Sequence, residues 1–557
     1  MSEKQHYYSQ LARSVIDTAN EPRPLWDWIS KHIMPRMTDA VQQCTPNPNR
    51  KRSIVACAAR SLAILASAHY SYITPGGTPW CEFHAPDEAT KERDARWYSA
   101  VSEAILKELS LSNFYTEIQE VYRSRSGLGT ALMLCEPKSS GKGVIFKHIP
   151  VGTFGIAEDK DGIVSTVCRQ FEYTAAQAVE RFGYNSVPHD VQTAYNEPTR
   201  RYSDKFKFLH LVTPRKEYTS GNFTATARNA KYASVYLFDG GDFPIVEEGG
   251  YAEFPYLCTR YLKWDGTVWG FPPVVQVMDS LQSLCKMDNN MDMLSDLAAF
   301  PRIMQLAEQS GEIDFRAGGV TTVTPQAASA GLPREWGTSG RYDIGKDRME
   351  DKKKDIEFAF NVPFVQVISN SEPGKMTATE VHARQSEQIV TISPTFTLFS
   401  YDNQPFMYRI YCVLFRQGRF DNLNGVTTPD NLKIDNKDAT GENISIRVPD
   451  VQLQGRITKD LKQAQSQSLE GLVSLLTNYV QATGDTSLFD HIDTGLLFRK
   501  IYESSGAPVD VLRSKSDVSK LRKAREEQQL AAQQAAIAQR QGAAALSFSK
   551  AATAQQQ

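Results

Sequence analysis

The chain has 557 residues, more than the roughly 250–300 that one hydrophobic core supports, so several subdomains are expected. Its 41% hydrophobic and 23% charged residues are typical of a folded soluble protein and exclude a disordered or fibrous one. A net charge of −2 excludes a surface that grips nucleic acid through a general basic excess, so any DNA partner is not held tightly.

The N-terminal third predicts helices. Residues 1–50 hold a short helical start and a proline-rich stretch with two tryptophans, which we expect to pack on a surface rather than form a core. The alanine-rich segment from Ser53 to Tyr70 predicts a helix that Pro75-Gly76-Gly77 ends. Another helix is expected from about Asn113 to Arg125. Before it, a helix shows apolar residues at steps of four: Trp97, Val101, Ile105 and Leu109.

From Gly129 to Trp264 the hydrophobic period shifts toward two, which predicts strands. One short helix, capped by Thr174 and ended by Gly183, interrupts them, and Asp159-Lys160-Asp161-Gly162 is typical of a hairpin turn. This pattern indicates an α+β body. The expected strands are Thr130–Cys135, Val144–Ile149, Ile163–Tyr173, Phe206–Val212, Ala233–Phe238 and Tyr256–Tyr261.

A long helix is predicted from Pro272-Pro273 to Phe300-Pro301, since proline is tolerated in a first helical turn. Carboxylates recur every four residues on one of its faces, at Asp288, Asp292 and Asp296. Stacked like charges weaken an isolated helix slightly. Another face carries an apolar stripe, formed by Val274, Val277 or Met278, Leu281, Leu284 or Cys285, Met291, Leu294 and Ala298.

Short extended runs broken by glycines follow up to Gly345 and predict a small β-type insertion. A second helix is expected over about Lys346 to Asn361, and Val362-Pro363 ends it. The next residues, Phe364 to Lys375, have the composition of an exposed loop. Thr377-Ala378-Thr379-Glu380 is a capping box that begins a third helix.

Pro394 and Pro405 interrupt this third helix, so we expect a kinked helix or two segments up to Gly418. A polar loop with a strand at Ile444–Val448 leads into about three helices between Gly455 and Leu521. The stretch from Glu526 to Gln557 is dominated by Ala and Gln, a composition that can be helical but cannot bury a core of its own.

No enzyme motif is found. Ser140-Gly141-Lys142-Gly143 lacks the earlier glycine and the Ser or Thr of a phosphate loop, so a hairpin turn is the better interpretation. Gly127-Leu128-Gly129-Thr130 lacks the third glycine of a dinucleotide loop. The nine histidines show no metal-binding spacing. The eight cysteines are scattered without a C-x-x-C pair, which indicates free thiols in a reducing compartment. We therefore expect no cofactor, no metal site and no catalytic site.

Several stretches together resemble the portal, or head-to-tail connector, proteins of podovirus-type bacteriophages. The resemblance lies in the order and spacing of its parts and extends from about residue 50 to 525. Its residues are Pro255-Tyr256-Leu257 with Arg260, Trp269-Gly270-Phe271-Pro272, Pro301 after the long helix, and Met376-Thr377-Ala378-Thr379-Glu380-Val381 with Arg384.

The resemblance implies a portal-type α+β fold that forms a ring, with a β-rich wing, long stem helices, a small β clip, a channel loop and a helical crown. The implied division is an N-terminal extension at 1–50, wing at 51–270, stem helices at 271–300 and 346–361, clip at 301–345, channel loop at 362–376, wing helix and following segment at 377–449, crown at 450–525 and an Ala/Gln-rich tail at 526–557.

The implied function is a non-enzymatic portal at a special capsid vertex, through which double-stranded DNA is packaged and ejected. The implied partners are further copies in a ring of twelve, the packaging ATPase (terminase large subunit), tail adaptor or tube proteins, and major capsid and scaffolding proteins. We expect no membrane partner, because no apolar run approaches the ~18 residues of a span and the N-terminus lacks a signal peptide's apolar core. The resemblance also implies that the protein assembles in the host cytoplasm and becomes part of the virion.

Two alternatives remain open: a cytosolic enzyme acting on nucleic acid or nucleotides without a recognised motif, and another tube or adaptor component of the virion. The mass of the particle in solution distinguishes a ring from an enzyme, because a ring would sediment near twelve times 62.3 kDa, while an enzyme of this length would usually be far smaller.

The acidic row also has two interpretations. A charged stripe is most often a solvated helix face. In a ring, the same carboxylates would line the channel and repel DNA phosphates, preventing a tight grip. The channel-lining candidates are Asp288, Asp292 and Asp296 with the loop residues Asn370, Ser371, Glu372 and Lys375. We also expect the apolar stripe of the long helix to be buried only when neighbouring subunits assemble.

Overall fold

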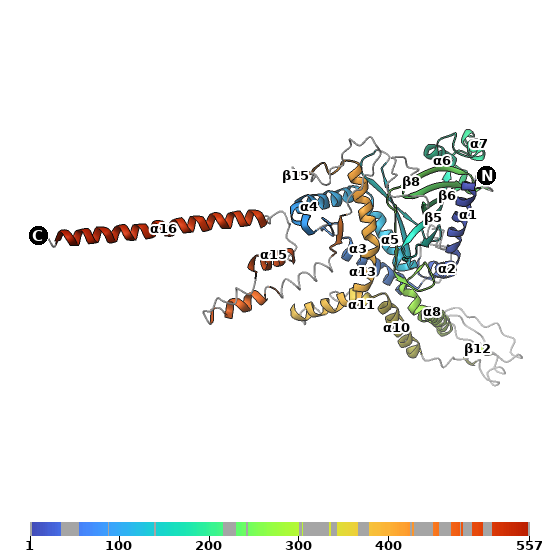
Figure 1. Ribbon diagram of the computed structural model, residues 1–557. Coiled ribbons are helices and arrows are strands. Elements are labelled where there is room, and N and C mark those ends of the chain that lie inside the picture. The colour runs from blue at the N-terminus through green and yellow to red at the C-terminus, as the bar shows by residue number, and fades with distance from the viewer. Residues whose placement is uncertain are drawn as a thin grey trace.

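The computed structural model describes most of the chain. The described residues are 3–34, 55–86, 88–138, 141–215, 230–240, 243–299, 303–304, 334–335, 342–365, 378–423, 426–427, 449–455, 469, 471–479, 481–482, 493–504 and 515–554. Figure 1 shows a body of mixed helices and sheets. Helices α8 (Met278–Ala299) and α10 (Tyr342–Ala359) extend from it on one side, and α15 (Thr494–Ser504) and α16 (Lys515–Ala554) on another. The expectation of an α+β chain is confirmed.

The N-terminal segment packs into the core, contrary to the expectation from its proline content. It forms α1 (Glu3–Asp17), η1 (Thr18–Asn20) and α2 (Arg23–His32). Trp26 of α2 is fully buried and donates from Nε1 to the Leu128 carbonyl at 3.0 Å. The physical reason is amphipathic spacing: Trp26, Ile29 and Ile33 recur on one helix face and all are buried.

The three expected helices that follow are confirmed: α3 (Ala56–Ile73), α4 (Glu88–Leu111) and α5 (Phe114–Leu128). The apolar residues spaced by four on α4 are all buried. Gly129 ends α5 with φ +85°, and its N–H donates to the Arg125 carbonyl at 3.0 Å. The Gly127-Leu128-Gly129-Thr130 stretch is therefore a helix C-cap, which explains its glycine at 129.

The strands form two main antiparallel sheets. The three-stranded sheet has the order β3-β2-β9 and the five-stranded sheet the order β4-β5-β6-β7-β8. All six expected strands are present. Two more, β4 and β8, were not predicted, because β4 is short and β8 contains Glu247-Glu248-Gly249-Gly250. The bounds are β2 (Thr130–Pro137), β3 (Val144–Ile149), β4 (Phe154–Glu158), β5 (Val164–Thr174), β6 (Lys205–Pro214), β7 (Tyr232–Phe238), β8 (Ile245–Tyr251) and β9 (Tyr256–Arg260).

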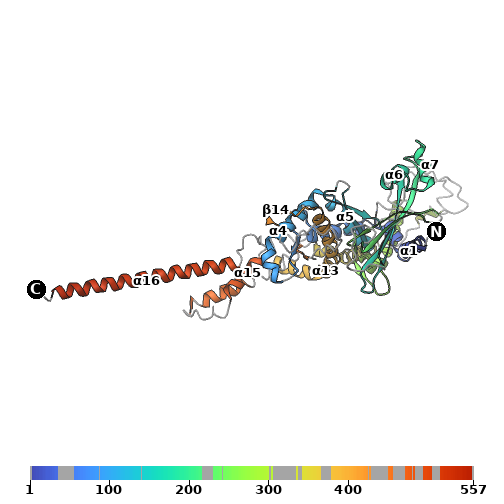
Figure 2. The same ribbon diagram turned by 45° about the horizontal axis from the view of Figure 1, so that its top comes forward.

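Helices cover both faces of the five-stranded sheet. Tyr8, Ala12 and Val15 of α1 pack on one face. On the other face, α6 (Ala175–Phe182) and α7 (His189–Asn196) pack over aromatic side chains that include Phe208. Thr174 and Gln177 form a complete capping box at the start of α6, and Gly183 ends it, as predicted. Figure 2 shows α6 and α7 at the outer edge of the body.

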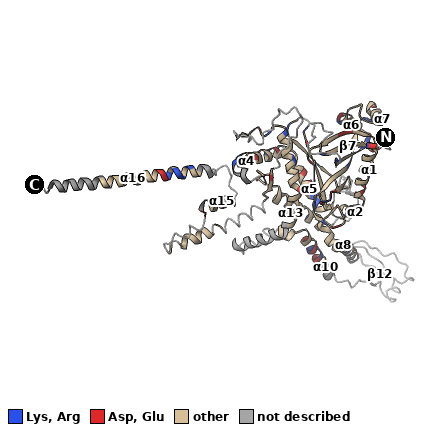
Figure 3. Cartoon of the chain, viewed as in Figure 1, with Lys and Arg blue, Asp and Glu red and all other residues tan. Residues whose placement is uncertain are grey.

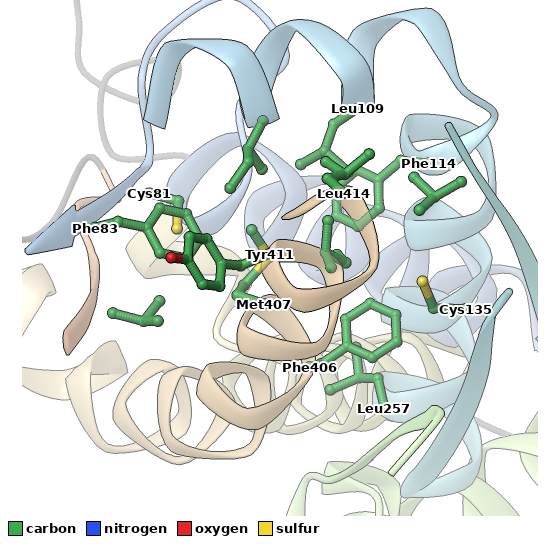
Figure 4. Close-up of a cluster of buried hydrophobic side chains, with 14 of the residues drawn as sticks. Cys81, Phe83, Leu109, Phe114, Cys135, Leu257, Phe406, Met407, Tyr411 and Leu414 are labelled. Carbon is green, nitrogen blue, oxygen red and sulfur yellow. The ribbon is translucent and has the colours of Figure 1, made fainter. Parts of the chain in front are cut away.

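The main hydrophobic cluster joins residues that lie far apart in the sequence. Figure 4 shows Phe83, Leu109 and Phe114 facing Phe406 and Tyr411 of α13 (Ala378–Arg416). Beside it, β1 (Cys81–His84) pairs with β16 (Asp450–Leu453) in an antiparallel ladder. Helix α13 therefore serves as a central support against which α4, α5 and the three-stranded sheet pack.

Helix α13 contains both expected prolines, and Figure 1 shows it bending between its first, yellow part and its second, orange part. The prediction of a kinked helix is confirmed. Within α13, the Thr395 carbonyl accepts a hydrogen bond from Nη2 of buried Arg125 at 2.9 Å. A short hairpin follows, with β14 (Asn422–Leu423) paired to β15 (Val426–Thr427).

The C-terminal segment is helical and extends away from the body. It includes α15 (Thr494–Ser504) and α16 (Lys515–Ala554), and Figures 1 and 2 both show α16 projecting outward. The side chains of α16 that the structure describes are almost all exposed. This agrees with the expectation that the Ala/Gln-rich tail buries no core of its own. The strand expected at Ile444–Val448 lies outside the described residues.

The cysteines in the described part of the chain are free thiols, as predicted, and Cys81, Cys135, Cys168 and Cys412 are buried. Burial raises the pKa of the Cys135 thiol to about 12, which makes it unreactive. Among the described helices, we find none with the length and apolar character needed to cross a bilayer.

Candidate functional site

The candidate site is a helical hairpin attached to the body through β10 (Leu262–Lys263) and β11 (Gly270–Phe271). After β11 come η3 (Pro273–Val277) and α8 (Met278–Ala299). The long helix predicted from Pro272-Pro273 thus begins with a 3-10 turn. Consecutive prolines supply no backbone N–H for the first turn, and short 3-10 turns are frequent at helix starts.

Trp269 anchors the start of this hairpin. Its side chain is fully buried, its Nε1 donates to the Thr18 carbonyl at 2.9 Å, and its ring lies 4.8 Å from Trp26 in an edge-to-face contact. Gly270 follows, and a Cβ there would overlap the carbonyl oxygen of Gly129. Trp269-Gly270 therefore joins the hairpin to both the N-terminal helices and the end of α5.

Helix α10 (Tyr342–Ala359) returns beside α8, and Figure 1 shows the pair side by side. Gly345 lets the two approach, because a Cβ there would meet the Met291 sulfur at 3.0 Å. Lys352 Nζ donates to Ser280 Oγ at 3.3 Å. Between the helices the structure describes β12 (Ile303–Met304) paired with β13 (Arg334–Glu335). The last residues of the expected clip, 342–345, are the start of α10, and its other residues lie outside the described part of the chain.

The expected burial of the apolar stripe by neighbouring subunits is wrong for the first half of α8. Leu281 is fully buried and Leu284 is 4% exposed within one subunit. They share a cluster with Ile356 of α10, with Phe360 just after that helix, and with residues of the body such as Leu62 of α3. The physical reason is that α10 and the adjoining body supply facing apolar residues within the same subunit. Further along α8, Met293 is 59% exposed.

Asp288, Asp292 and Asp296 are all exposed on α8. At about 1.5 Å per residue, successive carboxylates are separated by about 6 Å along the axis. No ion pair is found for these three among the described residues. Charges of both signs lie along α10, as Figure 3 shows. The row is a solvated acidic surface on an extended hairpin, suited to repelling a polyanion rather than to binding one.

The candidate residues of the loop lie outside the described part of the chain: Asn370, Ser371, Glu372 and Lys375. The position of this loop relative to Asp288, Asp292 and Asp296 is therefore not described. The structure describes the segment just before them, α11 (Val362–Val365). The first residues of the expected loop are therefore helical, since Pro363 fits the first turn of a new helix. Asn361, between α10 and α11, has φ +56°.

Sequence reasoning missed the anchoring role of Trp26. The spacing of Trp26, Ile29 and Ile33 was the signal that could have shown it. Reasoning also missed Arg125, which is fully buried and lies between the Tyr261 and Phe399 rings, at 5.3 and 5.5 Å from their centroids. Arg125 lies in a polar stretch at the end of α5, and nothing in the local sequence indicates that its side chain is buried.

The described residues hold no cluster of three or more His, Cys, Asp or Glu side chains placed to bind a metal ion. The three histidines with the most strongly lowered pKa values, His69, His148 and His210, owe this mainly to burial. Each is hydrogen-bonded to a serine hydroxyl. Burial and these hydrogen bonds account for the three histidines as parts of the packed interior.

Comparison with known proteins adds an independent finding. A family model described as "Bacteriophage head to tail connecting protein" matches residues 7–512. The "Portal protein" of Salmonella phage epsilon15 is 22% identical over 558 positions, covering 98% of this chain and 96% of that protein. The "Probable portal protein" of Bordetella phage BPP-1 is 24% identical over 376 positions, covering 66% of this chain and 67% of that protein.

Proposed function

Because the chain belongs to the bacteriophage head-to-tail connecting protein family, a structural and non-enzymatic family of virion proteins, we propose that it is the portal subunit of a phage head. In this role copies of the chain form a ring at one capsid vertex. Double-stranded DNA enters the head through the ring during packaging and leaves through it during ejection. The family match spans nearly the whole body of the protein and carries this proposal.

The family assignment replaces the enzyme alternative. It also agrees with the missing phosphate loop, since the proposed motor is a separate packaging ATPase, the terminase large subunit. Further proposed partners are tail adaptor or tube proteins, the major capsid protein and scaffolding proteins. The proposed ring has twelve subunits.

We assign the proposed subdomains to the chain as follows. The wing comprises residues 51–270 with the helix and segment at 377–449, and α1 and α2 of the N-terminal extension pack against it. The stem helices are 271–300 and 346–361, which contain most of the α8–α10 hairpin. The clip is 301–345, the channel loop is 362–376, and 450–525 form the crown. The tail is 526–557.

The exposed acidic row supports a channel role for the stem. An extended hairpin that presents Asp288, Asp292 and Asp296 to solvent can face DNA without binding it. We propose that these three carboxylates line the channel, together with Asn370, Ser371, Glu372 and Lys375.

Electron micrographs of the purified full-length protein, with its sedimentation velocity, test the assembly. We expect rings with a central hole and a mass near twelve times 62.3 kDa. A protein that stays monomeric at high concentration, and also fails to enter heads when produced with capsid and scaffolding proteins, would contradict the portal role.

A further inference from the structure

The two short strands β10 and β11 carry an exposed aromatic pair where the α8–α10 hairpin leaves the body. Trp264 stacks on Phe271 with ring centroids 4.0 Å apart, yet the tryptophan remains 50% exposed. Its neighbour Asp265 is also exposed, and no ion pair is found for this carboxylate among the described residues. We call Trp264, Phe271 and Asp265 the Trp264 patch, an apolar surface beside a negative charge.

Helix α10 carries a second exposed aromatic side chain near the same base. Phe358 is 62% exposed and lies against Phe364 of α11, with ring centroids 5.5 Å apart. Lys354, also exposed, lies four residues earlier and so shares the helix face of Phe358. In the described part of the chain Lys354 forms no ion pair, not even with Glu350 or Asp351 one turn earlier. We call Phe358, Phe364 and Lys354 the Phe358 patch, an apolar surface beside a positive charge.

The two patches lie on different flanks of the hairpin base. Lys263, next to Trp264, donates to Glu158 Oε2 at 2.8 Å, which ties the Trp264 patch to β4 at the edge of the five-stranded sheet. Phe364 instead packs against the main hydrophobic cluster, to which α13 contributes. Figure 1 shows α11 and α13 on one side of α10 and the five-stranded sheet on the other.

Two different surfaces on one chain are what a ring contact requires, because copies related by rotation join one surface of a subunit to another surface of the next. The two patches match each other: both present an exposed aromatic ring, and their charges are opposite in sign. Either patch placed against a second copy of itself would bring like charges together. The pattern therefore favours head-to-tail association over a two-fold dimer.

We propose that the Trp264 patch of one subunit contacts the Phe358 patch of a second copy of this chain, with Asp265 facing Lys354 across the contact. This inference rests on the proposed ring and names the residues that join its subunits at the base of the stem. Tryptophan and other aromatic side chains contribute a large share of the binding free energy at many protein interfaces, while complementary charges select the partner and its orientation.

Charge reversal in the full-length protein tests the contact. Asp265→Lys and Lys354→Asp each bring like charges together, whereas the double variant restores an opposite pair. Sedimentation velocity over a concentration series gives the concentration at which half of the chains are in rings. We expect this concentration to rise about tenfold or more in each single variant, because like charges across an interface oppose association, and to return toward the wild-type value in the double variant.

Two further variants control for charge alone. Asp190→Lys and Lys205→Asp alter exposed charges away from both patches, on α7 and at the start of β6, and should assemble as the wild type does. Trp264→Ala should weaken assembly while the circular dichroism of the monomer stays unchanged. Single variants that assemble normally, or a double variant that does not recover, would overturn the contact and leave the ring itself standing. A wild type that forms no rings would contradict the proposed function and this contact together.

Discussion

Gly129 and Gly270 touch backbone to backbone at the point where the α8–α10 hairpin leaves the body. Gly129 needs φ +85° to end α5, and its carbonyl accepts from Tyr261 N at 2.8 Å. Gly270 N donates to Thr130 Oγ1 at 2.9 Å. Neither partner can move without breaking one of these hydrogen bonds, so this junction is stiff.

Gly270→Ala should therefore destabilise the protein. The new methyl group would overlap the Gly129 carbonyl, and forced overpacking typically costs about 1–3 kcal/mol. Chemical denaturation measures the change. Gly77→Ala is the matched control, because a Cβ there meets nothing within 4 Å. Equal midpoints for the two variants would show that the junction tolerates a side chain.

The burial of His148 predicts that the stability of the folded protein depends on pH. Burial lowers the pKa of its imidazole from 6.5 to about 4. Between those values the unfolded chain takes up a proton that the folded chain does not, so stability falls as pH falls through this window. The full loss approaches about 3 kcal/mol.

His148→Gln should flatten the stability profile between pH 6.5 and 4, while glutamine can still bond Ser124 Oγ. His189→Gln, at an exposed position, should leave the profile unchanged. Denaturant midpoints measured across this range decide the matter. A His148→Gln profile parallel to that of the wild type would contradict the assignment.

Among the elements, the first half of α8 is buried within one subunit, against α10 and the adjoining body. Leu281→Ala should cost about 2–5 kcal/mol because it leaves a cavity in a closed core. Met293→Ala, on the same helix but 59% exposed, should change stability by less than about 0.5 kcal/mol. Denaturation of both variants at one protein concentration measures this. An unchanged midpoint for Leu281→Ala would mean that this half of α8 is not buried within one subunit.

The acidic row gives a second prediction at this scale. Changing Asp288, Asp292 and Asp296 to Lys should make DNA binding tighter and more salt-dependent, with a log–log slope steeper by about 0.9 per added phosphate contact. Filter binding over a range of salt concentrations measures it. Changing three exposed wing carboxylates, Asp161, Glu180 and Asp190, is the control for charge alone. If both triple variants bind DNA equally, the row does not face the channel.

The elements were predictable where local signals agreed. The capping box at Thr174, the prolines of α13 and the period-two strands each reflect backbone and burial preferences that act over a few residues. The burial of Leu281 within one subunit was not predictable in the same way. It depends on residues far along the chain, such as Ile356 of α10, which a local pattern does not contain.

At the scale of the whole molecule, the proposed channel loop predicts a defect in DNA retention. Deleting Asn370–Gly374 shortens a segment with no long apolar side chain, and loop closure changes little with such a length. We expect rings and DNA entry near normal, and heads that lose packaged DNA. The measurement is the fraction of full heads over time, with a deletion of similar length in the Ala/Gln-rich tail as control. Heads that retain DNA as the wild type does would contradict the valve role.

The proposed division into subdomains rests on the family resemblance, because no local pattern in the sequence marks the boundaries of the proposed stem, clip and crown. The α+β class followed from period and composition alone. The acidic row could be placed on one helix face from its spacing, but which way that face points in a ring depends on neighbouring copies, whose contacts no single-chain pattern encodes.

The pairing of β1 with β16 has a consequence for how the chain is made. These strands are separated by more than 360 residues, and the cluster beside them joins Phe83 and Leu109 to Phe406 and Tyr411. At about 5–20 residues per second, the ribosome needs roughly 20–75 s to deliver β16 after β1. For most of that interval, until α13 has been made, the apolar faces of α4 and α5 lack their covering helix. Newly made chains are therefore exposed to aggregation until α13 arrives, and folding in the cell should be sensitive to chaperone supply.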